Sequence, residues 1–215
     1  MQKLGNTLVN MTVVLTLVAI VTGVILAYVN NVTKEPIDEQ KKETLASGIK
    51  SVMQDNNLQV VSTDTVKKTE QEDNKEYTYV IYSVNNAKGE PLGKAVESTT
   101  MGFGGALKVL IGFNISGDIK GYTILETTET PGLGAKADQW FQAGNKGSII
   151  DKNPGTDKLK VTKDGGSVDA ITASTITSRA FLKAVNQAYA ATQIDVAEEE
   201  TGVAMASEVG EQSNN

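Results

Sequence analysis

The sequence predicts an α+β fold in which a single transmembrane helix precedes one domain with a mainly antiparallel sheet and flanking helices. Three observations support this: an uncharged apolar run over 8–29, segments rich in β-branched and aromatic residues between 77 and 126, and a helix-patterned run after Asp169–Ser178. A length of 215 residues and a hydrophobic fraction of 40% suffice for one ordinary domain plus an appendage. We expect a short N-terminal segment (1–7), the transmembrane helix (8–29), a juxtamembrane linker and helix (30–50), the domain (51–192) and an acidic disordered tail (193–215).

The chain contains no Cys and no His. This composition excludes thiolate nucleophiles, Cys-ligated iron–sulfur clusters, thioether-linked haem, His-based triads and most zinc sites. Redox chemistry would therefore depend on an organic cofactor, and we expect no metal site. A chain without Cys also fits an extracytoplasmic location, where a stray thiol is a liability.

The formal net charge of −6 comes from the end of the chain, where no Lys or Arg follows Lys183. The predicted tail carries six acids, namely Asp195, Glu198, Glu199, Glu200, Glu208 and Glu211. The rest of the chain is close to neutral, so no basic surface for nucleic acid is indicated and nucleic acid is not an expected partner. The tail is also poor in aromatics and lacks periodicity, which predicts disorder.

The transmembrane prediction depends on residues 8–29, which read LVNMTVVLTLVAIVTGVILAYV without a charge. A helix of this length rises about 33 Å, enough to cross a hydrocarbon core. The run is longer than the apolar region of a cleaved signal peptide. Lysines flank it on both sides, at Lys3 and at Lys34, so the charges alone do not decide its orientation.

A polar juxtamembrane region follows over 30–50. Pro36 is expected to break the helix there, because proline lacks the amide donor that a helix interior needs. The positions after Pro36 return to helical spacing, with apolar residues at Ile37, Leu45 and Ile49. The region is therefore predicted to be a linker that leads into a short amphipathic helix.

Strand-forming segments dominate the next part of the chain. Residues 77–84 and 93–98 are expected to pair around the turn at Lys88-Gly89, and 107–114 and 119–126 to form a hairpin around a Ser-Gly-Asp turn. Residues 159–161 are expected to form a further short strand. The glycine cluster 102–105 is not a dinucleotide-binding fingerprint, because it lacks the third glycine and a strand follows it; a flexible loop edge is expected.

The loop from Glu126 to Lys136 contains Pro131 and two glycines, which predict an irregular, exposed backbone suited to lining a ligand site. The residues after it place the only Trp, Trp140, on a short helix over 139–141, where core packing is the expected role.

The run Asp169–Ser178 places five hydroxyl side chains within seven positions. Apolar and small residues then recur at helical spacing, so a helix is expected after Ser178 that runs to about Thr192 with one buried face. Helix N-termini attract anions, so the run is a candidate phosphate site. The alternative is that Ser174 or Thr175 serves only as an N-cap.

Two motifs together resemble the FMN-binding domain of the G subunit of the Rnf electron transport complex and of its relative NqrC, the C subunit of the sodium-pumping NADH:quinone reductase. They are Glu129-Thr-Pro-Gly-Leu-Gly134 and Asp169-Ala-Ile-Thr-Ala-Ser-Thr-Ile-Thr177. The resemblance implies that Thr175 carries FMN through a phosphoester bond made by a separate magnesium-dependent flavin transferase. Ala173 stands where the family usually has Gly, a change that disfavours a left-handed backbone, and Ser174 stands where it usually has Ala.

The resemblance also implies roles for neighbouring residues. Amides around Ile176 and Thr177 would bind the flavin phosphate without a basic pocket, Leu133 would offer an apolar contact, and Lys136 a charge near the ring. The full set of expected cofactor-binding residues is Thr175, Glu129, Thr130, Leu133, Gly134, Lys136, Ala170, Thr172, Ala173, Ser174, Ile176 and Thr177.

The resemblance further implies that the chain is an electron-carrier subunit of a translocase. Such a complex moves electrons between ferredoxin and NAD and couples this transfer to the translocation of sodium ions or protons. Such a subunit is not catalytically complete alone, and its partners would be other membrane subunits of the complex. The family implies an N-terminus inside and a flavin domain on the extracytoplasmic side of the bacterial cytoplasmic membrane. The short chain and the run over 163–172 favour the G subunit of Rnf over NqrC.

Two other classes of protein remain open at this point. A membrane-anchored envelope or pilin-like interaction module fits the anchor-plus-domain layout, although the apolar run lacks the early buried Glu that pilins use. An extracytoplasmic hydrolase has carboxylates available in Glu126 and Glu129, but no convincing catalytic partner accompanies them.

Overall fold

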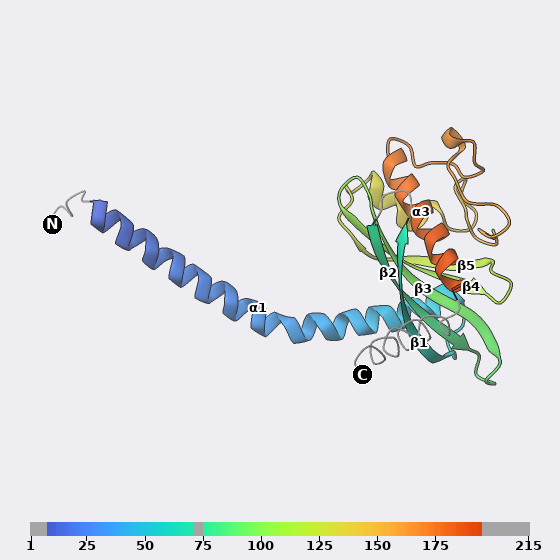
Figure 1. Cartoon of the computed structure of the whole chain (residues 1–215), viewed down its shortest axis with the longest axis horizontal. Helices are drawn as coiled ribbons and strands as arrows, with labels where there is room; N and C mark the ends of the chain where they lie inside the picture. The colour runs from blue at the N-terminus through green and yellow to red at the C-terminus, as the bar shows by residue number, and fades with distance from the viewer. Residues whose placement is uncertain (1–7, 71–74, 195–215) are drawn as a thin grey trace, which may run out of the picture. The chain divides into compact units, whose positions relative to one another are not determined.

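The computed structural model describes residues 8–70 and 75–194 and divides into two compact units, with the boundary between Leu45 and Ala46. The predicted α+β class is confirmed, because a long apolar helix is followed by a five-stranded antiparallel sheet with helices (Figure 1). The expected N-terminal segment 1–7, and the acidic tail from residue 195 onward, lie outside the described residues.

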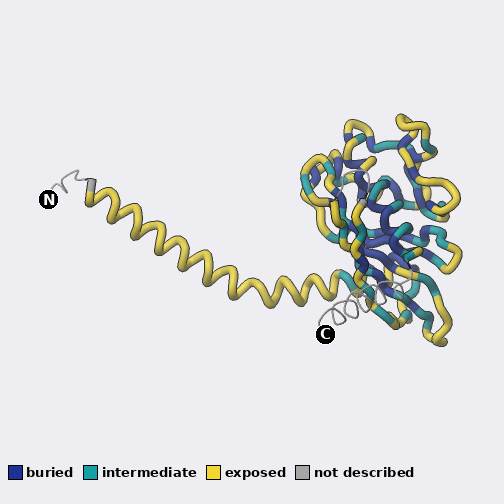
Figure 2. The backbone as a smooth tube through the Cα atoms, in the orientation of Figure 1, coloured by how far each residue is buried: buried dark blue, intermediate teal, exposed yellow. Residues whose placement is uncertain are grey.

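Helix α1 (Leu8–Met53) has 46 residues. Its most apolar 18 residues have a mean hydropathy of 2.5 and none is buried in the protein, so the helix is consistent with a membrane anchor (Figure 2). The hydroxyls of Thr16 and Thr22 donate to the carbonyls of Thr12 and Val18, each at 2.8 Å. These polar side chains are therefore satisfied within their own helix.

The predicted helix break at Pro36 is wrong, because α1 continues through this residue. Proline removes one amide donor, but the sequence that follows it is rich in Glu, Gln, Lys, Leu and Ala, which all favour helix. Over this stretch the strong propensity of the neighbours outweighs one unfavourable residue. The separate linker and short helix expected over 30–50 are thus parts of a single helix.

The five strands form a meander in the order β1-β2-β3-β4-β5, and every pair is antiparallel. Both predicted strand pairs are confirmed, but the first strand was not predicted. Its sequence, QVVSTDTVKKTE, is largely polar, and Val66 is its contribution to the core. A strand at the sheet edge pairs on one side only and needs little apolar surface. The strands are β1 (Gln59–Glu70), β2 (Lys75–Asn85), β3 (Pro91–Met101), β4 (Ala106–Asn114) and β5 (Ile119–Thr127).

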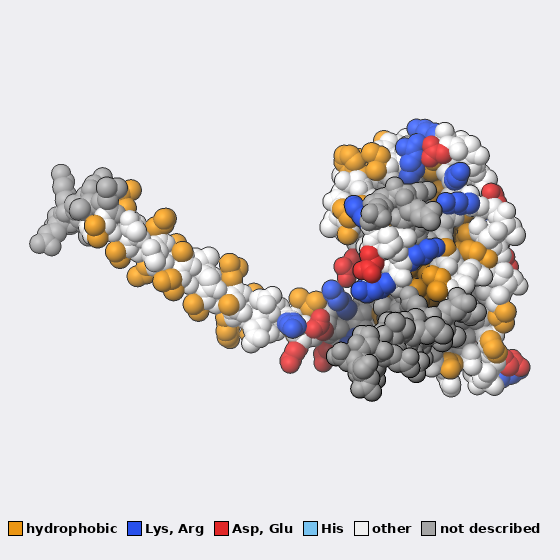
Figure 3. Space-filling view, viewed as in Figure 1, with side chains coloured by type: hydrophobic (Ala, Val, Ile, Leu, Met, Phe, Trp, Pro, Cys, Tyr) orange, Lys and Arg blue, Asp and Glu red, His pale blue; other side chains and the backbone are white. Residues whose placement is uncertain are grey.

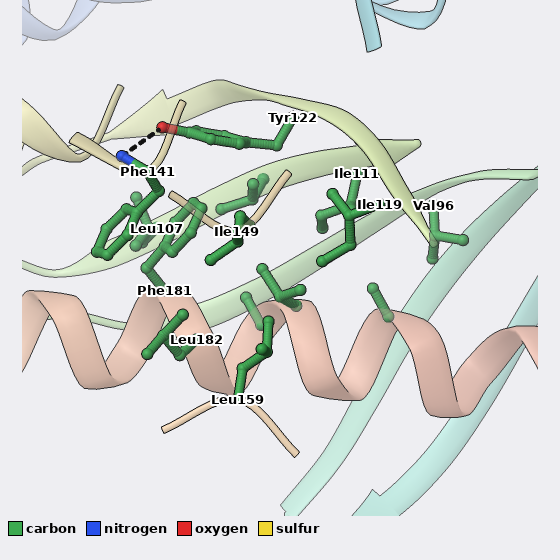
Figure 4. Close-up of a cluster of buried hydrophobic side chains, with 14 of the residues drawn as sticks. Val96, Leu107, Ile111, Ile119, Tyr122, Phe141, Ile149, Leu159, Phe181 and Leu182 are labelled. Atoms are coloured by element: carbon green, nitrogen blue, oxygen red, sulfur yellow. Dashed lines mark hydrogen bonds between the residues drawn. The ribbon is translucent and has the colours of Figure 1, made fainter. Parts of the chain in front are cut away.

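Helix α3 (Thr175–Thr192) packs against one face of the sheet and buries the main hydrophobic core (Figure 4). Phe141 and Phe181 stack with their ring centroids 4.3 Å apart, and the ring of Tyr122 meets Phe181 edge-on at 4.8 Å. The Tyr122 hydroxyl donates to the carbonyl of Ala137 at 2.6 Å and accepts the amide of Phe141 at 3.2 Å. These contacts fix the loop after β5 relative to the start of α3.

The opposite face of the sheet packs against the last turns of α1, where Ile49, Val52 and Met53 are buried. A buried carboxylate, Glu97, accepts the hydroxyl of Tyr82 at 2.6 Å and pairs with the ammonium of Lys108 at 2.6 Å. Burial of its phenol, together with the neighbouring Glu97 carboxylate, raises the pKa of Tyr82.

Two predicted elements differ in detail. Residues 159–161 do not form a strand, since Val161 makes a single bridge to Val168 and no further strand lies beside it in the described part of the chain. The short helix is α2 (Ala137–Trp140), which follows the 3₁₀ turn η1 (Gly134–Lys136) and begins two residues earlier than expected. Trp140 is half-buried against the core and its indole donates to the carbonyl of Asp169 at 2.8 Å, as core packing predicts.

Candidate functional site

A pocket of about 310 Å³ forms where three segments meet: the β3–β4 turn, the loop after β5 and the start of α3. Nine of the residues predicted from the two motifs line it, together with one aromatic residue that was not predicted. The lining is predominantly apolar. Its residues are Phe103, Glu129, Thr130, Leu133, Gly134, Ala173, Ser174, Thr175, Ile176 and Thr177.

Three predicted residues lie outside this pocket. Lys136 and Thr172 are exposed beside it, and Ala170 packs partly against the core. The charge expected from Lys136 near a bound ring is therefore not among the lining side chains. Ala170 and Thr172 belong to the second motif and Lys136 follows the first, but none of the three lines the pocket.

Phe103 is the lining residue that the sequence motifs did not predict. It lies in the glycine cluster expected to be a flexible loop edge, and its side chain is 72% exposed. The turn is held in place, because the amide of Phe103 donates to Glu129 Oε1 at 2.7 Å and the amide of Gly102 to the carbonyl of Gly105 at 2.8 Å. The signal in the sequence that could have identified Phe103 is an aromatic residue set between glycines in a loop, where it is expected to be exposed.

The side chain of Glu129 joins the two motifs. It is 7% exposed, and Gly134 lies so close to it that a Cβ at that position would overlap Glu129 Oε2 and stand 2.8 Å from Thr177 Oγ1. Any side chain at Gly134 would therefore push the loop away from α3. The glycine that ends the first motif is required by its contact with the second.

The first turn of α3 leaves donors available at the pocket. Ser174 occupies the N-cap position, but its side chain makes no capping hydrogen bond. Among the described residues no acceptor is present for the amides of Thr175, Ile176 and Thr177. Unpaired amides at a helix N-terminus bind anions, so the N-cap and phosphate interpretations of this run are compatible.

Ser178 connects the start of this helix to the turn before it. Its hydroxyl donates to the carbonyl of Ser174 and accepts the amide of Ile171, both at 2.9 Å. The serine thus closes the turn that precedes α3 and fixes the direction in which the free amides point.

Ala173 adopts a left-handed backbone with φ of 62°, a conformation that favours glycine. The sequence predicted that this alanine would disfavour such a backbone, and the structure retains the left-handed turn with alanine in place. The position is therefore strained, which is common where a backbone serves a ligand site.

Replacing Ala173 with Gly is expected to leave the free energy of unfolding unchanged or to raise it by about 1 kcal/mol. Relief of left-handed strain, about 1–2 kcal/mol, is partly offset by the greater freedom of Gly in the unfolded chain. Ala184→Gly, inside α3, is the matched control and should lower the free energy of unfolding by at least about 1 kcal/mol. Urea unfolding of the detergent-solubilised chain, followed by Trp140 fluorescence, measures the free energy of unfolding of both variants. If Ala173→Gly lowers it as much as Ala184→Gly does, position 173 is not strained.

A lysine approaches the hydroxyl at the centre of the second motif. Lys163, in the 3₁₀ turn η2 (Thr162–Asp164), donates from its Nζ to Thr175 Oγ1 at 3.3 Å. The sequence pattern predicted no basic group at the phosphate end of the pocket. Lys163 belongs to the run that leads into the motif, but it lies twelve positions before Thr175 in sequence, so only the folded turn shows the contact.

The turn that carries Lys163 is clamped to α3 by an ion pair. Arg179 Nε and Nη2 donate to the two carboxylate oxygens of Asp164, each at 2.7 Å. The hydrogen bonds from Arg179 hold the pKa of Asp164 below its usual range, and the same contact raises the pKa of Arg179. This two-point contact fixes η2 one helical turn beyond Thr175.

Arg179→Met is expected to return the pKa of Asp164 toward its ordinary value. Because the pKa of Asp164 is lowered in the folded state, the clamp stabilises the fold at neutral pH, and this contribution is lost as the pH falls through the lowered pKa. Carboxyl ¹³C NMR titration measures the shift. Asp118, whose pKa is lowered by hydrogen bonds from Asn114 and Asn153, is the internal control and should not change. An unchanged pKa at Asp164 in the variant would argue against the clamp.

Comparison with protein families matches residues 102–190 to the FMN-binding domain and residues 1–52 to the RnfG N-terminal region. The first match contains both motifs of the pocket. The G subunit of the ion-translocating oxidoreductase complex from Vibrio atlanticus (strain LGP32) is 36% identical over 176 residues, which cover 78% of this chain and 81% of that protein. This chain belongs to the RnfG family, the G subunits of the ion-translocating oxidoreductase complex.

More distant comparisons agree with this membership. The G subunit from Cereibacter sphaeroides is 30% identical over 175 residues, covering 80% of this chain and 78% of that protein. The crystal structure of NqrC from Shewanella oneidensis shares 15% identity with a TM-score of 0.52, over 70% of this chain and 93% of that chain. At this identity the likeness to NqrC shows a common fold alone. The resemblance to the G subunit of Rnf, inferred from the two motifs, is confirmed.

Proposed function

We propose that this RnfG protein is a membrane-anchored covalent flavoprotein that carries FMN on Thr175 and passes electrons within an ion-translocating ferredoxin:NAD oxidoreductase complex. The observation that supports it best is that the two motifs, distant in sequence, line one pocket at a helix N-terminus. The chain would be an electron carrier and not a complete enzyme by itself.

The helix end of the pocket fits a phosphoryl group attached to Thr175. Thr175 lines the pocket, and the amides of Thr175, Ile176 and Thr177 have no acceptor among the described residues. The Lys163 ammonium lies 3.3 Å from the Thr175 hydroxyl. A phosphate diester keeps a negative charge, which the helix dipole, the amides and the ammonium all favour. These groups would hold the phosphate and orient what is attached to it.

The apolar part of the pocket lining fits a flat aromatic ring. Phe103, Leu133 and Ile176 come from three different segments and are 72%, 43% and 53% exposed. Exposed apolar side chains gathered around one pocket indicate a ligand surface. FMN, when bound, supplies the redox chemistry; these side chains would pack against its ring and exclude water from it.

The remaining assignments follow from family membership. Maturation would require a flavin transferase, and the partners would be the other membrane subunits of the complex. The apolar part of α1 would cross the bacterial cytoplasmic membrane once, with the flavin domain on the extracytoplasmic side.

The alternatives have less support. The relatives that match at 30% to 36% identity over most of the chain are G subunits of the ion-translocating complex, whereas NqrC shares 15% identity. An interaction module of the pilin type needs no ligand pocket, so it does not account for the unpaired amides at the start of α3. A hydrolase is disfavoured because Glu126 does not line the pocket and Glu129 already accepts a backbone amide.

Thr175→Ala is expected to abolish covalent flavin, because it removes the only atom of this side chain to which a phosphoryl group can be attached. The measurement is the intact mass of denatured, transferase-matured protein, which should lack the gain of FMN less water. Thr172→Ala, an exposed hydroxyl outside the pocket, is the control and should keep the gain. Undiminished flavin fluorescence of the Thr175→Ala protein on a denaturing gel would reject the assignment.

Lys163→Gln is expected to slow flavin attachment about fivefold, the effect of losing one charge-assisted hydrogen bond at a partly exposed site. Lys163→Arg keeps the charge and should retain most of the rate. Lys136→Gln removes an exposed charge outside the pocket and should have no effect. Timed intact-mass measurements with the transferase give the rates of flavin attachment. Equal rates for Lys163→Gln and Lys136→Gln would show that Lys163 does not take part in attachment.

A further inference from the structure

A second concave surface lies along α3 and shares no lining residue with the flavin pocket. This groove, of about 700 Å³, runs between α3, the end of β1 and residues 158–161. Figure 3 shows Lys and Arg side chains gathered on the face of the domain that carries α3. The cationic side chains of the groove are Lys68, Lys158, Lys160, Arg179 and Lys183.

The described part of the groove carries a single carboxylate, Asp164, which is already paired with Arg179. Among the described lining residues, five cationic side chains therefore stand against one carboxylate. Closely spaced cations of this kind attract acidic partners and increase the rate of association with them.

A buried amide in the groove has unused hydrogen-bonding capacity. Gln187 is 6% exposed, and neither its Nε2 nor its Oε1 has a hydrogen-bond partner among the described residues. Buried side-chain amides are rarely left unpaired, because both the donor and the acceptor lose water. Gln187 is one of the residues that line the groove, so a ligand bound there could supply the missing partners.

The neighbouring residue shows which kind of group such an amide binds here. The side chain of Asn186 accepts the amide of Leu159 at 3.0 Å and donates to the carbonyl of the same residue at 2.8 Å. Both residues line the groove. A side-chain amide in this groove thus already binds a peptide backbone at two points, and Gln187 offers the same pair of atoms beside it.

We propose that this groove binds an acidic peptide segment of another subunit of the complex, with the lysines pairing to its carboxylates and Gln187 to its backbone. The Asp164–Arg179 pair lies in the groove wall and also fixes the turn that carries Lys163. A segment docked here would lie next to Thr175, so its role in electron transfer rests on the proposed function, whereas its binding does not.

The test uses the full chain in detergent and a fluorescein-labelled 12-residue peptide of alternating Glu and Gly, followed by fluorescence anisotropy. Binding is expected at low ionic strength and should weaken as salt is added. The double variant Lys158→Gln/Lys160→Gln should weaken binding about tenfold. Gln187→Met keeps the side-chain volume but removes the amide and should weaken it about fivefold.

Two controls separate groove binding from general attraction between charges. Lys88→Gln/Lys146→Gln makes the same change in net charge outside the groove and should leave the affinity unchanged. A peptide with the same Glu residues but an N-methylated backbone should bind about fivefold more weakly to the native chain and no more weakly to Gln187→Met. Equal weakening by both lysine pairs, or equal affinity for the two peptides, would overturn the proposal.

Two further outcomes are decisive. If a chain ending at Ile194 binds the peptide while the full chain does not, the acidic residues 195–211 of the chain itself are the occupant and the partner proposal is wrong. Thr175→Ala should bind the peptide as the native chain does. If Thr175→Ala loses covalent flavin and still binds the peptide, both proposals are supported. If the native chain binds the peptide but never gains flavin, the proposed function is wrong and the groove proposal stands.

Discussion

The buried carboxylate of Glu129 connects the three segments that form the candidate flavin pocket. One oxygen accepts the amide of Phe103 from the β3–β4 turn, and the other lies against Gly134, which in turn lies against Thr177 of α3. A buried carboxylate is stable only while it has hydrogen-bond partners, so the turn and the loop depend on each other. The pocket therefore depends on one buried side chain, to which the β3–β4 turn is hydrogen-bonded and beside which Gly134 of the loop after β5 meets the start of α3.

Helix α3 serves three roles because its sides face different surroundings. Its apolar side packs on the sheet through Phe181 and fills the core. Its first turn presents unpaired amides to the pocket, and its remaining side lines the basic groove. The Arg179–Asp164 pair joins the last two surfaces, since it lies in the groove wall and fixes the turn whose lysine reaches Thr175. Binding in the groove and the geometry at Thr175 therefore share a structural element.

The start of α3 is not built for stability alone. Ala173 adopts a left-handed backbone, the Ser174 side chain does not cap the helix, and three amides have no acceptor among the described residues. Each of these features lowers stability, and together they occur at one place, where both sequence motifs meet. Such local departures from stable geometry are typical of ligand sites, because the bound group completes the interactions that the fold leaves open.

The sequence by itself determined the α+β class, the apolar helix, four of the five strands, the helix to Thr192 and the two motifs, with Thr175 in the second. These features depend on local patterns, namely hydrophobic periodicity, turn residues and short motifs, which the linear sequence contains. The edge strand β1, the continuity of α1 through Pro36, the lining residue Phe103 and the contact of Lys163 with Thr175 were decided only by the tertiary structure. An edge strand needs little apolar surface of its own, and neighbouring helix formers outweigh one proline. Phe103 and Lys163 reach the site from turns whose positions are fixed by Glu129 and by the Arg179–Asp164 pair. These contacts join residues that are far apart in sequence, so a local sequence pattern cannot predict them.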